Sequence, residues 1–432
     1  MSKLPSVGLA PTGRRIAARV IGRVLFDGAY AAAALDTELS RATGLDPREK
    51  GLATEIAYGV LRTRAVLVER ITRHAKRAPR DEITLVHLLV AVYQILLLER
   101  VPAHAAVNAA VEAVRAERGE KLAGFVNAVL RRIAASGERL DPVRAVVDSG
   151  PAWLVDRLAA AVGDDEAARL LGSHGVPPTG IRLVSGHDVP DWIATAAEGR
   201  VSPRARRISD SGDLRIRPGF REGSFVIQEE GAQVIALLLG ARANERVLDA
   251  CAGRGQKTSL LSEMVGAGGA VWAADLHPKK LEALKAESER LGLPCPTCRA
   301  VDLSVGVADL PADFDRVLVD APCSGTGTLL RRPEIKERLD PGDPARLGEL
   351  QATLLERAAS RLRPGGRLVY AVCSVLPEEA EAVVERVRDT LEPVPFDAPE
   401  LEGRLALDRS SLRLLPGAHG TDGYFVASFV RR

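Results

Sequence analysis

The second half of the chain alternates short apolar segments with amphipathic segments of helical spacing. Strand-like segments are expected at residues 246–250, 270–276, 299–301, 315–319 and 367–372, with helical stretches between most of them. Strands that alternate with helices in this way form parallel sheets, and the crossover helices cover both faces. The sequence therefore predicts a Rossmann-like α/β domain with a doubly wound sheet over residues 224–432.

The first part of the chain has apolar residues at helical spacing, such as Ile16, Val20 and Val24. Helix breaks are expected at the Asp46-Pro47 pair and at Pro102. We expect an all-helical domain over residues 1–140, so the protein is predicted to have several domains. A polar connector at 136–151 marks its end. A helix at 154–171 and a strand at 181–184 predict a small α+β subdomain over residues 150–223.

Charge is divided unevenly along the chain. Residues 1–150 carry 23 Lys and Arg against 16 Asp and Glu, although the formal net charge of the whole chain is only +2. A basic domain suits contact with the phosphates of a nucleic acid, and an ordinary solvated surface explains the surplus equally well. No segment reaches the roughly 20 apolar residues of a membrane span, and residues 1–13 lack the apolar core of a secretory signal. We expect a cytoplasmic protein without a membrane role.

A glycine turn follows the first predicted strand, with the sequence Cys251-Ala-Gly-Arg-Gly-Gln-Lys-Thr258. Gly253 and Gly255 would let the backbone come close to a ligand. The turn is not a phosphate-binding P-loop, because that motif needs glycine where Cys251 and Gln256 stand. A dinucleotide-binding fold stays open, since one glycine turn followed by an acid is a weak signal.

Acidic residues end the predicted strands, at the edge where open α/β sheets bind ligands. The first strand ends in Asp249, and the second ends in Asp275, where an acid can accept hydrogen bonds from both hydroxyls of a ribose. Asp302 follows the third strand and is placed for the edge of an adenine, and Asp320 ends the fourth. Together these residues predict an adenosine-containing ligand.

Two cysteines follow adjacent later strands. Cys323 lies in Asp320-Ala-Pro-Cys-Ser-Gly325, and Cys373 lies in Tyr370-Ala-Val-Cys-Ser374. The chain has five cysteines, and an odd number without a secretory signal favours reduced thiols. A single cysteine is more often a small buried hydrophobe, but two thiols at neighbouring strand ends favour chemistry.

Cytosine methylation at carbon 5 is a reaction that needs such a thiol. A thiolate that adds to carbon 6 makes carbon 5 nucleophilic toward a sulfonium methyl group, and loss of the carbon 5 proton then expels the thiolate. The site has to favour the ionised thiol, and Asp320 can hydrogen-bond the cytosine ring as charge develops. The target base has to be unpaired or flipped out of its stack.

The remaining cysteine pair, Cys295 and Cys298, does not predict a metal site. One CxxC pair without a second pair or nearby histidines cannot supply the four ligands of a structural zinc. The seven histidines of the chain are scattered without metal-ligand spacing. We expect no metal.

These segments resemble the signatures of the NOL1/NOP2/Sun family of RNA cytosine-5 methyltransferases. The resemblance rests on the run from Asp249 to Thr258 and on the two cysteine segments, the second followed by Pro377-Glu-Glu379. It extends to residues 228–233 (QEEGAQ) and 422–425 (DGYF). Residues 100–108 (RVPAHAAVN) and 124–132 (GFVNAVLRR) resemble the NusB-like RNA-binding domain of the bacterial branch that methylates small-subunit ribosomal RNA.

The resemblance implies an enzyme with S-adenosylmethionine as its cofactor and RNA as its partner. Cys373 would attack the cytosine, Cys323 would assist release of the product, and Lys257 matches the active-site lysine of the family. Asp320 would act beside them. The residues implied to hold the cofactor are Cys251, Ala252, Gly253, Arg254, Gly255, Gln256, Lys257, Asp275, Asp302 and Asp320.

The chain departs from the family pattern without losing a reactive group. Arg254 and Gln256 add bulk to the glycine turn, and Val372 replaces a threonine before Cys373. Two alternatives stay open, a non-catalytic RNA-binding scaffold and a paralogue that methylates another RNA. A DNA cytosine methyltransferase is disfavoured, because those enzymes rely on a separate Glu-Asn-Val motif that this chain lacks.

Overall fold

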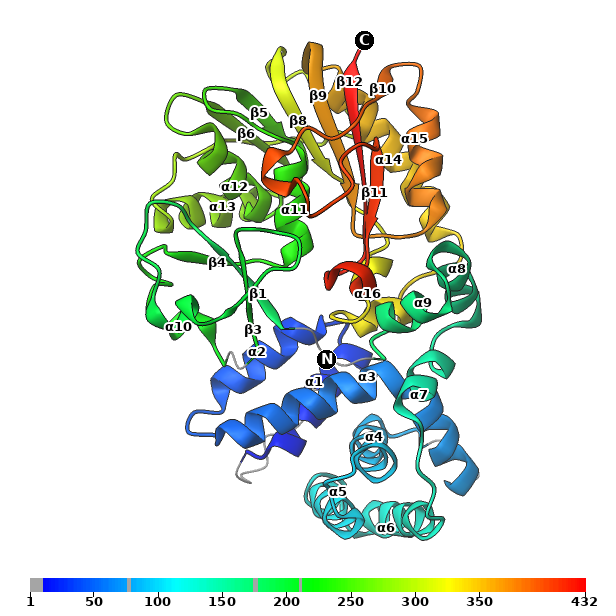
Figure 1. The fold of residues 1–432 in the computed structure, drawn as a ribbon. Helices are drawn as coiled ribbons and strands as arrows, with labels where there is room; N and C mark the ends of the chain where they lie inside the picture. The colour runs from blue at the N-terminus through cyan, green and yellow to red at the C-terminus, as the bar shows by residue number, and fades with distance from the viewer. Residues whose placement is uncertain (1–10, 76–78, 174–177, 210–211) are drawn as a thin grey trace. The chain divides into compact units, whose positions relative to one another are not determined.

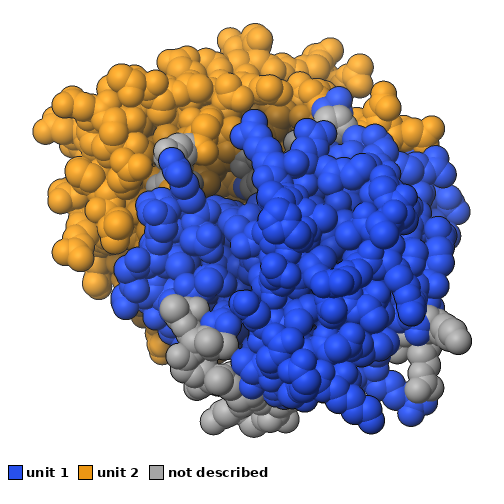
Figure 2. All heavy atoms as spheres, turned by 90° about the horizontal axis from the view of Figure 1, so that it is seen from below, with its two compact units in different colours: residues 1–159, 167–176, 329–339 blue, residues 160–166, 177–328, 340–432 orange. Residues whose placement is uncertain are grey.

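The computed structural model describes residues 11–75, 79–173, 178–209 and 212–432 (Figure 1). Most of the segment 1–13, considered above as a signal, lies outside these residues. The chain divides into two compact units, coloured separately in Figure 2. The helical unit holds residues 1–159, 167–176 and 329–339, and the sheet unit holds residues 160–166, 177–328 and 340–432. The three domains that the sequence predicts, over 1–140, 150–223 and 224–432, stay a prediction.

The helical unit is built around α4 (Glu82–Leu97), which is buried on nearly all sides. Its apolar sequence explains this position, because a helix that is hydrophobic all round needs neighbours on every face. Asp81 caps its start by accepting a hydrogen bond from the backbone N–H of Thr84 at 2.8 Å. Helices α1, α3, α5 and α6 pack against it. The helices that begin in this unit are α1 (Gly13–Phe26), α2 (Ala31–Arg41), α3 (Pro47–Ala75), α5 (Ala103–Arg118), α6 (Glu120–Ala135), α7 (Pro142–Asp148) and α8 (Ala152–Val162).

A late segment of the chain, residues 329–339, belongs to the helical unit. It contains the short 3-10 helix η3 (Pro333–Glu337). The buried guanidinium of Arg62 in α3 donates a hydrogen bond to the carbonyl of Leu330 at 2.6 Å, and the buried amine of Lys336 donates to the carbonyl of Arg62 at 2.6 Å. Burial lowers the pKa of Lys336 to about 8. The carboxylate of Glu334 accepts from the backbone N–H of Ala31, so polar bonds fix this segment among the helices.

The prediction of a single helix over residues 154–171 is wrong in detail. The structure has α8, ending at Val162, and then α9 (Asp164–Leu170). Gly163 separates them with a φ of +85°, a left-handed conformation that an α-helix cannot contain and that glycine adopts without steric cost.

The sheet unit begins with a small antiparallel sheet in the order β2-β3-β1-β4. Its strands are β1 (Thr179–Leu183), β2 (Ala197–Glu198), β3 (Ala205–Ile208) and β4 (Phe225–Ile227), joined by α10 (Asp191–Ala194) and the 3-10 helix η1 (Leu214–Ile216). Ile181, Ile193, Ile208 and Phe225 form its core. The strand expected at 181–184 is part of β1.

The main sheet has the order β10-β12-β9-β8-β5-β6-β7, with β11 paired to β12. Its strands are β5 (Arg246–Asp249), β6 (Ala270–Asp275), β7 (Thr297–Ala300), β8 (Phe314–Asp320), β9 (Leu362–Val372), β10 (Leu391–Pro393), β11 (Ser411–Leu414) and β12 (Tyr424–Arg431). The five strands from β5 to β9 pair in parallel, as the sequence predicts. The sheet as a whole is mixed, because β10, β11 and β12 pair in antiparallel fashion.

Helices cover both faces of this sheet, which confirms the doubly wound α/β fold (Figure 1). Alternate residues of one strand face opposite sides, so Leu248 packs toward α14 and α15 while Val247 packs toward α11 and α12. The helices of this unit are α11 (Glu230–Leu238), α12 (Gln256–Val265), α13 (Pro278–Arg290), α14 (Asp343–Ala359), α15 (Glu381–Arg386) and α16 (Pro416–His419), with 3-10 helices η2 (Thr326–Thr328), η4 (Pro377–Glu379) and η5 (Pro399–Leu401). Across the described residues, no helix is both long and apolar enough to cross a bilayer.

Candidate active site

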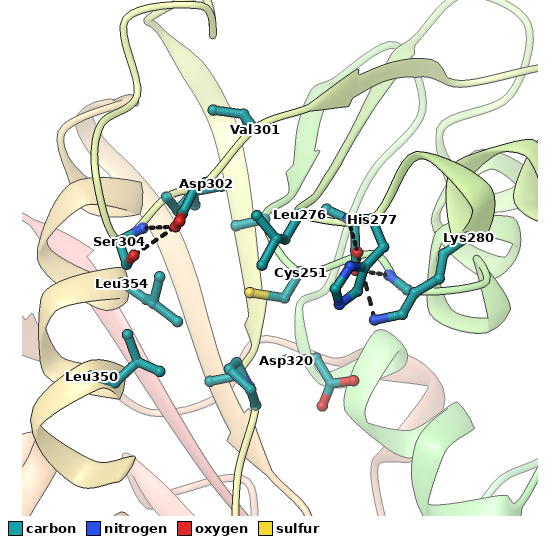
Figure 3. A pocket seen from close by; sticks show the side chains of 16 residues that line it. Cys251, Leu276, His277, Lys280, Val301, Asp302, Ser304, Asp320, Leu350 and Leu354 are labelled. Atoms are coloured by element: carbon teal, nitrogen blue, oxygen red, sulfur yellow. Dashed lines mark hydrogen bonds and ion pairs between the residues drawn. The ribbon is translucent and has the colours of Figure 1, made fainter. Parts of the chain in front are cut away.

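A cavity of about 320 Å³ opens at the carboxyl ends of the central strands (Figure 3). The first strand, β5, lies between β6 and β8, so the chain leaves this point in opposite directions along the sheet, and such switch points form ligand crevices. Side chains from four strand ends line the cavity, together with apolar residues of the loops and of α14. Its lining includes Cys251, Gly253, Asp275, Leu276, Val301, Asp302, Asp320, Leu350 and Leu354.

The glycine turn adopts the geometry that its sequence predicts. Gly253 and Gly255 have φ values of +58° and +84°, in the left-handed region. A Cβ on Gly255 would lie 2.4 Å from the side chain of Leu284, whereas nothing lies within 4 Å of one on Gly253, which faces the cavity. Arg254 and Gln256 are exposed, and Gln256 donates to the carbonyl of Ile227 at 3.0 Å. Ala252, Arg254, Gly255, Gln256 and Lys257 are not part of the cavity lining.

Asp249 lies fully buried behind this turn. One carboxylate oxygen accepts a hydrogen bond from the hydroxyl of Thr258 at 2.7 Å, and within the described residues the other oxygen has no partner. Burial raises the pKa of the Asp249 carboxyl to about 7, because a charged carboxylate is disfavoured away from water. Asp249 is not part of the cavity lining.

Asp275 and Asp302 both line the cavity, and Figure 3 labels Asp302 beside Ser304. The carboxylate of Asp275 accepts from the backbone N–H of Gly253 at 3.0 Å and of His277 at 2.8 Å, so it ties the second strand end to the glycine turn. Asp302 accepts from the backbone N–H and the hydroxyl of Ser304, and these hydrogen bonds lower the pKa of its carboxyl. Acids above apolar walls suit a ligand with hydroxyl groups and a flat ring.

Lys257 and Asp320 form an ion pair beside the cavity. The amine of Lys257 lies 2.6 Å from a carboxylate oxygen of Asp320. Burial by itself would lower the pKa of this amine, but the charge of Asp320 and its hydrogen bond raise it above its ordinary value. Lys257 therefore stays protonated and can hold negative charge near it.

The two cysteines expected at neighbouring strand ends lie together. Cys323 and Cys373 are free thiols, with their sulfur atoms 3.1 Å apart. A disulfide would have a length of about 2.05 Å, so this is a contact between two reduced groups. The hydrogen bond to Cys373, together with burial, raises the pKa of Cys323. Cys251 is a separate thiol in the cavity wall, and burial raises its pKa.

The other cysteine pair forms no comparable site. Cys295 is exposed, and Cys298 lies half-buried in β7. In the parts of the chain that the structure describes, no three His, Cys, Asp or Glu side chains come together as a metal site. The absence of a metal from the protein stays a prediction.

Several residues that hold this edge of the sheet unit were not assigned roles from the sequence. Arg182 is fully buried, donates to Gln228 at 2.9 Å and forms an ion pair with Glu263 of α12 at 2.6 Å. Glu229 accepts from the hydroxyl of Tyr424 at 2.8 Å and so joins the segments QEEGAQ and DGYF, almost 200 residues apart. Both segments were noted as part of the resemblance, and that resemblance was the signal available for them.

Comparison with known proteins identifies the family. The family model of the RsmB/F 16S rRNA methyltransferases matches residues 236–430, and that of the NusB family matches residues 11–135. The ribosomal RNA small subunit methyltransferase B of Salmonella enteritidis is 33% identical over 404 residues, which are 89% of this chain and 91% of that protein. This chain belongs to the RsmB/F family. A methyltransferase of Mycobacterium tuberculosis is 36% identical and covers 97% of the chain and 96% of its own length.

Solved structures agree with the fold of this RsmB/F family member. The crystal structure of PH0851 matches with a TM-score of 0.81 at 23% identity, over 98% of this chain and 99% of that one. A methyltransferase homolog from Pyrococcus horikoshii matches with a TM-score of 0.53 at 26% identity, over 64% of this chain and 93% of its own. The resemblance to the NOL1/NOP2/Sun family and the NusB-like domain are confirmed, and the protein is an RNA methyltransferase that depends on S-adenosylmethionine.

Proposed function

We propose that this protein methylates carbon 5 of a cytosine in small-subunit ribosomal RNA, with Cys373 as the covalent nucleophile. The observation that carries the proposal is the pair of reduced thiols at the ends of β8 and β9, 3.1 Å apart. One thiol suffices for attack on a base, and a second in contact with it provides a group that can act on the adduct.

The residues around the cavity fit the cofactor. We assign Asp275 to the ribose hydroxyls, Asp302 to the adenine edge, and the glycine turn, through Gly253, to the methionine end. When bound, S-adenosylmethionine supplies an electrophilic methyl group. Asp320 lines the cavity and begins the segment that carries Cys323, which supports a target base beside that end of the cofactor site.

The bond changes on cytosine follow from the proposed nucleophile. The sulfur of Cys373 bonds to carbon 6, and the electron pair of the carbon 5–carbon 6 bond moves so that carbon 5 can take up the methyl group. Negative charge develops on the ring near N3, where the Lys257–Asp320 pair can provide a hydrogen bond. A base then removes the carbon 5 proton, the electron pair of that bond restores the carbon 5–carbon 6 double bond, and the carbon–sulfur bond breaks with its electron pair on the sulfur of Cys373.

The contact between the sulfurs suggests how the two thiols divide the work. The hydrogen bond to Cys373 and burial raise the pKa of Cys323, so Cys323 retains its proton and shares it with its neighbour. The resemblance to the family carries the assignment of attack to Cys373 and of product release to Cys323, and a Cys323 that keeps its proton is consistent with it.

The helical unit is proposed to bind the RNA. Its NusB family match and the basic surplus of residues 1–150 support contact with phosphates. The name of the Salmonella relative, ribosomal RNA small subunit methyltransferase B, motivates the same target here. The proposal places the protein in the cytoplasm with this RNA and without a membrane partner.

Bisulfite sequencing of ribosomal RNA tests the proposal directly. Cells that lack the gene should lose methylation at one cytosine of the small-subunit RNA, the wild-type gene should restore it, and the gene for Cys373→Ala should not. Restoration by Cys373→Ala would contradict the assigned nucleophile. Unchanged methylation in the deletion strain, with RNA bound by the purified protein, would favour a scaffold or a different RNA target.

A further inference from the structure

Glu379 is the most deeply buried acid beside the two cysteine loops. It ends the 3-10 helix η4, and its exposed fraction is 0%. Its carboxylate is held by hydrogen bonds from neutral groups. One oxygen accepts from the backbone N–H of Ser324 at 2.8 Å and from the amide of Gln351 at 3.0 Å. The other accepts from the hydroxyl of Ser374 at 2.6 Å and from that of Ser324.

These donors belong to the two loops that carry the reactive sulfurs. Ser324 directly follows Cys323, and Ser374 directly follows Cys373. Ser374 also hydrogen-bonds Thr326 at 2.9 Å, and the backbone N–H of Gly327 donates to the carbonyl of Cys373 at 3.0 Å. A single side chain thus joins the residue after one cysteine to the residue after the other.

Glu379 is itself anchored to the rigid part of the sheet unit. The hydroxyl of Tyr370, a fully buried residue of β9, donates to the backbone carbonyl of Glu379 at 2.7 Å and to Gln351 at 3.0 Å. Gln351, on α14, also donates to the carbonyl of Pro322 at 2.9 Å. Hydrogen bonds from β9 and α14 therefore hold Glu379 in place independently of its contacts with the two cysteine loops.

We propose that Glu379 is a positioning residue that sets the spacing of the two sulfurs by holding both cysteine loops to one buried carboxylate. None of these hydrogen bonds joins Glu379 to a sulfur atom, so Glu379 acts through Ser324 and Ser374. The inference rests on the proposed two-thiol chemistry, because only that chemistry gives the spacing a catalytic consequence.

A carboxylate suits this position better than an amide of the same shape. Its two oxygens can accept all four hydrogen bonds. A glutamine has only one such oxygen, so its amide N–H groups would face either the N–H donors of Ser324 and Gln351, which cannot accept, or the two serine hydroxyls, which would have to turn their own hydrogens away. A buried donor left without an acceptor moves or takes in water, because leaving it unsatisfied is costly. The loops would then relax, and a misplacement of about 1 Å in a reacting group can slow a reaction by about a hundredfold.

The test uses the full-length protein with Glu379→Gln and, as a matched control, Glu381→Gln. Glu381 is an exposed acid two residues away, ion-paired with Arg413. Three quantities are measured: steady-state methylation of RNA, the single-turnover rate of adduct formation on RNA with 5-fluorocytosine at the target, and the rate at which diamide oxidises Cys323 and Cys373 to a disulfide. In the last reaction the two thiols lose two electrons and two protons to diamide, which becomes a hydrazine, and peptide mass spectrometry maps the bridge.

We expect Glu379→Gln to bind S-adenosylmethionine within about twofold of wild type and to keep the KM for RNA, while kcat and the adduct rate fall about 30- to 100-fold. Disulfide formation should slow as well, since it depends on the distance between the sulfurs. Glu379→Asp, which keeps the charge but is one methylene shorter, should recover part of each rate. Glu381→Gln should match wild type in all three.

A purely structural role would lower the melting temperature of Glu379→Gln and leave all three rates unchanged at temperatures where it is folded, and that result would overturn the inference. If Glu379→Gln does not fold, Ser374→Ala and Ser324→Ala replace it. Each should slow the formation of the adduct and of the disulfide. Rates equal to those of wild type would contradict the inference. Failure of the proposed function gives a different pattern: no cytosine methylation by wild type, with the disulfide rate still dependent on Glu379.

Discussion

The proposed cofactor cavity and the pair of cysteine loops lie at one edge of the same sheet, and their polar groups differ in burial and in hydrogen bonding. In the cavity, acids such as Asp302 are partly exposed, and behind its glycine turn the buried Asp249 has an oxygen that the described residues leave without a donor. Around the cysteines, the serine hydroxyls and the carboxylate of Glu379 bond to one another and are buried. A cavity that exchanges its ligand keeps hydrogen-bond acceptors available. Two reacting atoms that keep a fixed spacing instead need surrounding polar groups that are all hydrogen-bonded to one another.

The strongest contrast is expected from loss of the proposed nucleophile. Cys373→Ala should abolish methyl transfer and should fail to cross-link to RNA that carries 5-fluorocytosine, while S-adenosylmethionine still binds its separate cavity. Wild type should give a stable adduct, because fluorine cannot leave carbon 5 as a cation. Denaturing gels and calorimetry measure the two properties, with Cys295→Ala, at an exposed thiol, as the control. Methyl transfer by Cys373→Ala would remove the nucleophile from the proposal.

Loss of the second thiol should give the opposite result on a denaturing gel, an adduct that accumulates. Cys323→Ala should still attack but release the product slowly, so that a denaturant-resistant protein–RNA adduct accumulates even on ordinary cytosine. The time course of the adduct and of methylated RNA distinguishes attack from release. An adduct on ordinary cytosine in Cys373→Ala and not in Cys323→Ala would reverse the two roles.

Asp249 should make stability depend on pH. Its pKa is about 7 in the folded protein, through burial, and about 3.9 in an unfolded chain. The folded state therefore binds the proton more tightly, and the stability that this group contributes is complete below pH 4 and is lost as pH rises to 7. The loss amounts to about 4 kcal/mol. Urea unfolding from pH 4 to pH 8 should show a smaller decline in Asp249→Asn than in wild type. Lys257 and Asp320 face the same group and are common to both proteins, so equal declines would contradict the assigned pKa.

The smallest of these effects is expected at the cofactor's ribose. Asp275→Ala should weaken S-adenosylmethionine by roughly 1.5–3 kcal/mol, about ten- to a hundredfold, because one or two charge-assisted hydrogen bonds are lost. Part of the loss comes from the glycine turn, since Asp275 also holds the backbone of Gly253. Calorimetry on Asp275→Ala and on Asp408→Ala, at an exposed acid outside the cavity, makes the comparison. Equal affinities in all three proteins would exclude Asp275 from the site.

The fold and the meeting of the strand-end residues at one edge could be predicted because they depend on local patterns. Parallel strands place their carboxyl ends at one edge, so the acids Asp249, Asp275 and Asp320 had to come near one another. The strand β12 was missed, since a run of buried residues has no alternation to reveal it. The sulfur spacing and the role of Glu379 depend on side chains from separate elements. Nothing in the order of Cys323, Cys373 and Glu379 specifies the distances between them.

The helical unit cannot be completed until residues 329–339 have been synthesised. Arg62 can form its hydrogen bond to the carbonyl of Leu330 only after the chain has grown by 268 further residues. At a synthesis rate of about 5–20 residues per second, a ribosome reaches that partner roughly 15 to 50 seconds after it has made α3. Until then the Arg62 guanidinium lacks this acceptor, and the helices that form first remain an unfinished structure. We expect nascent chains released before residue 329 to be cleaved by proteases within α3, at sites that the complete protein protects.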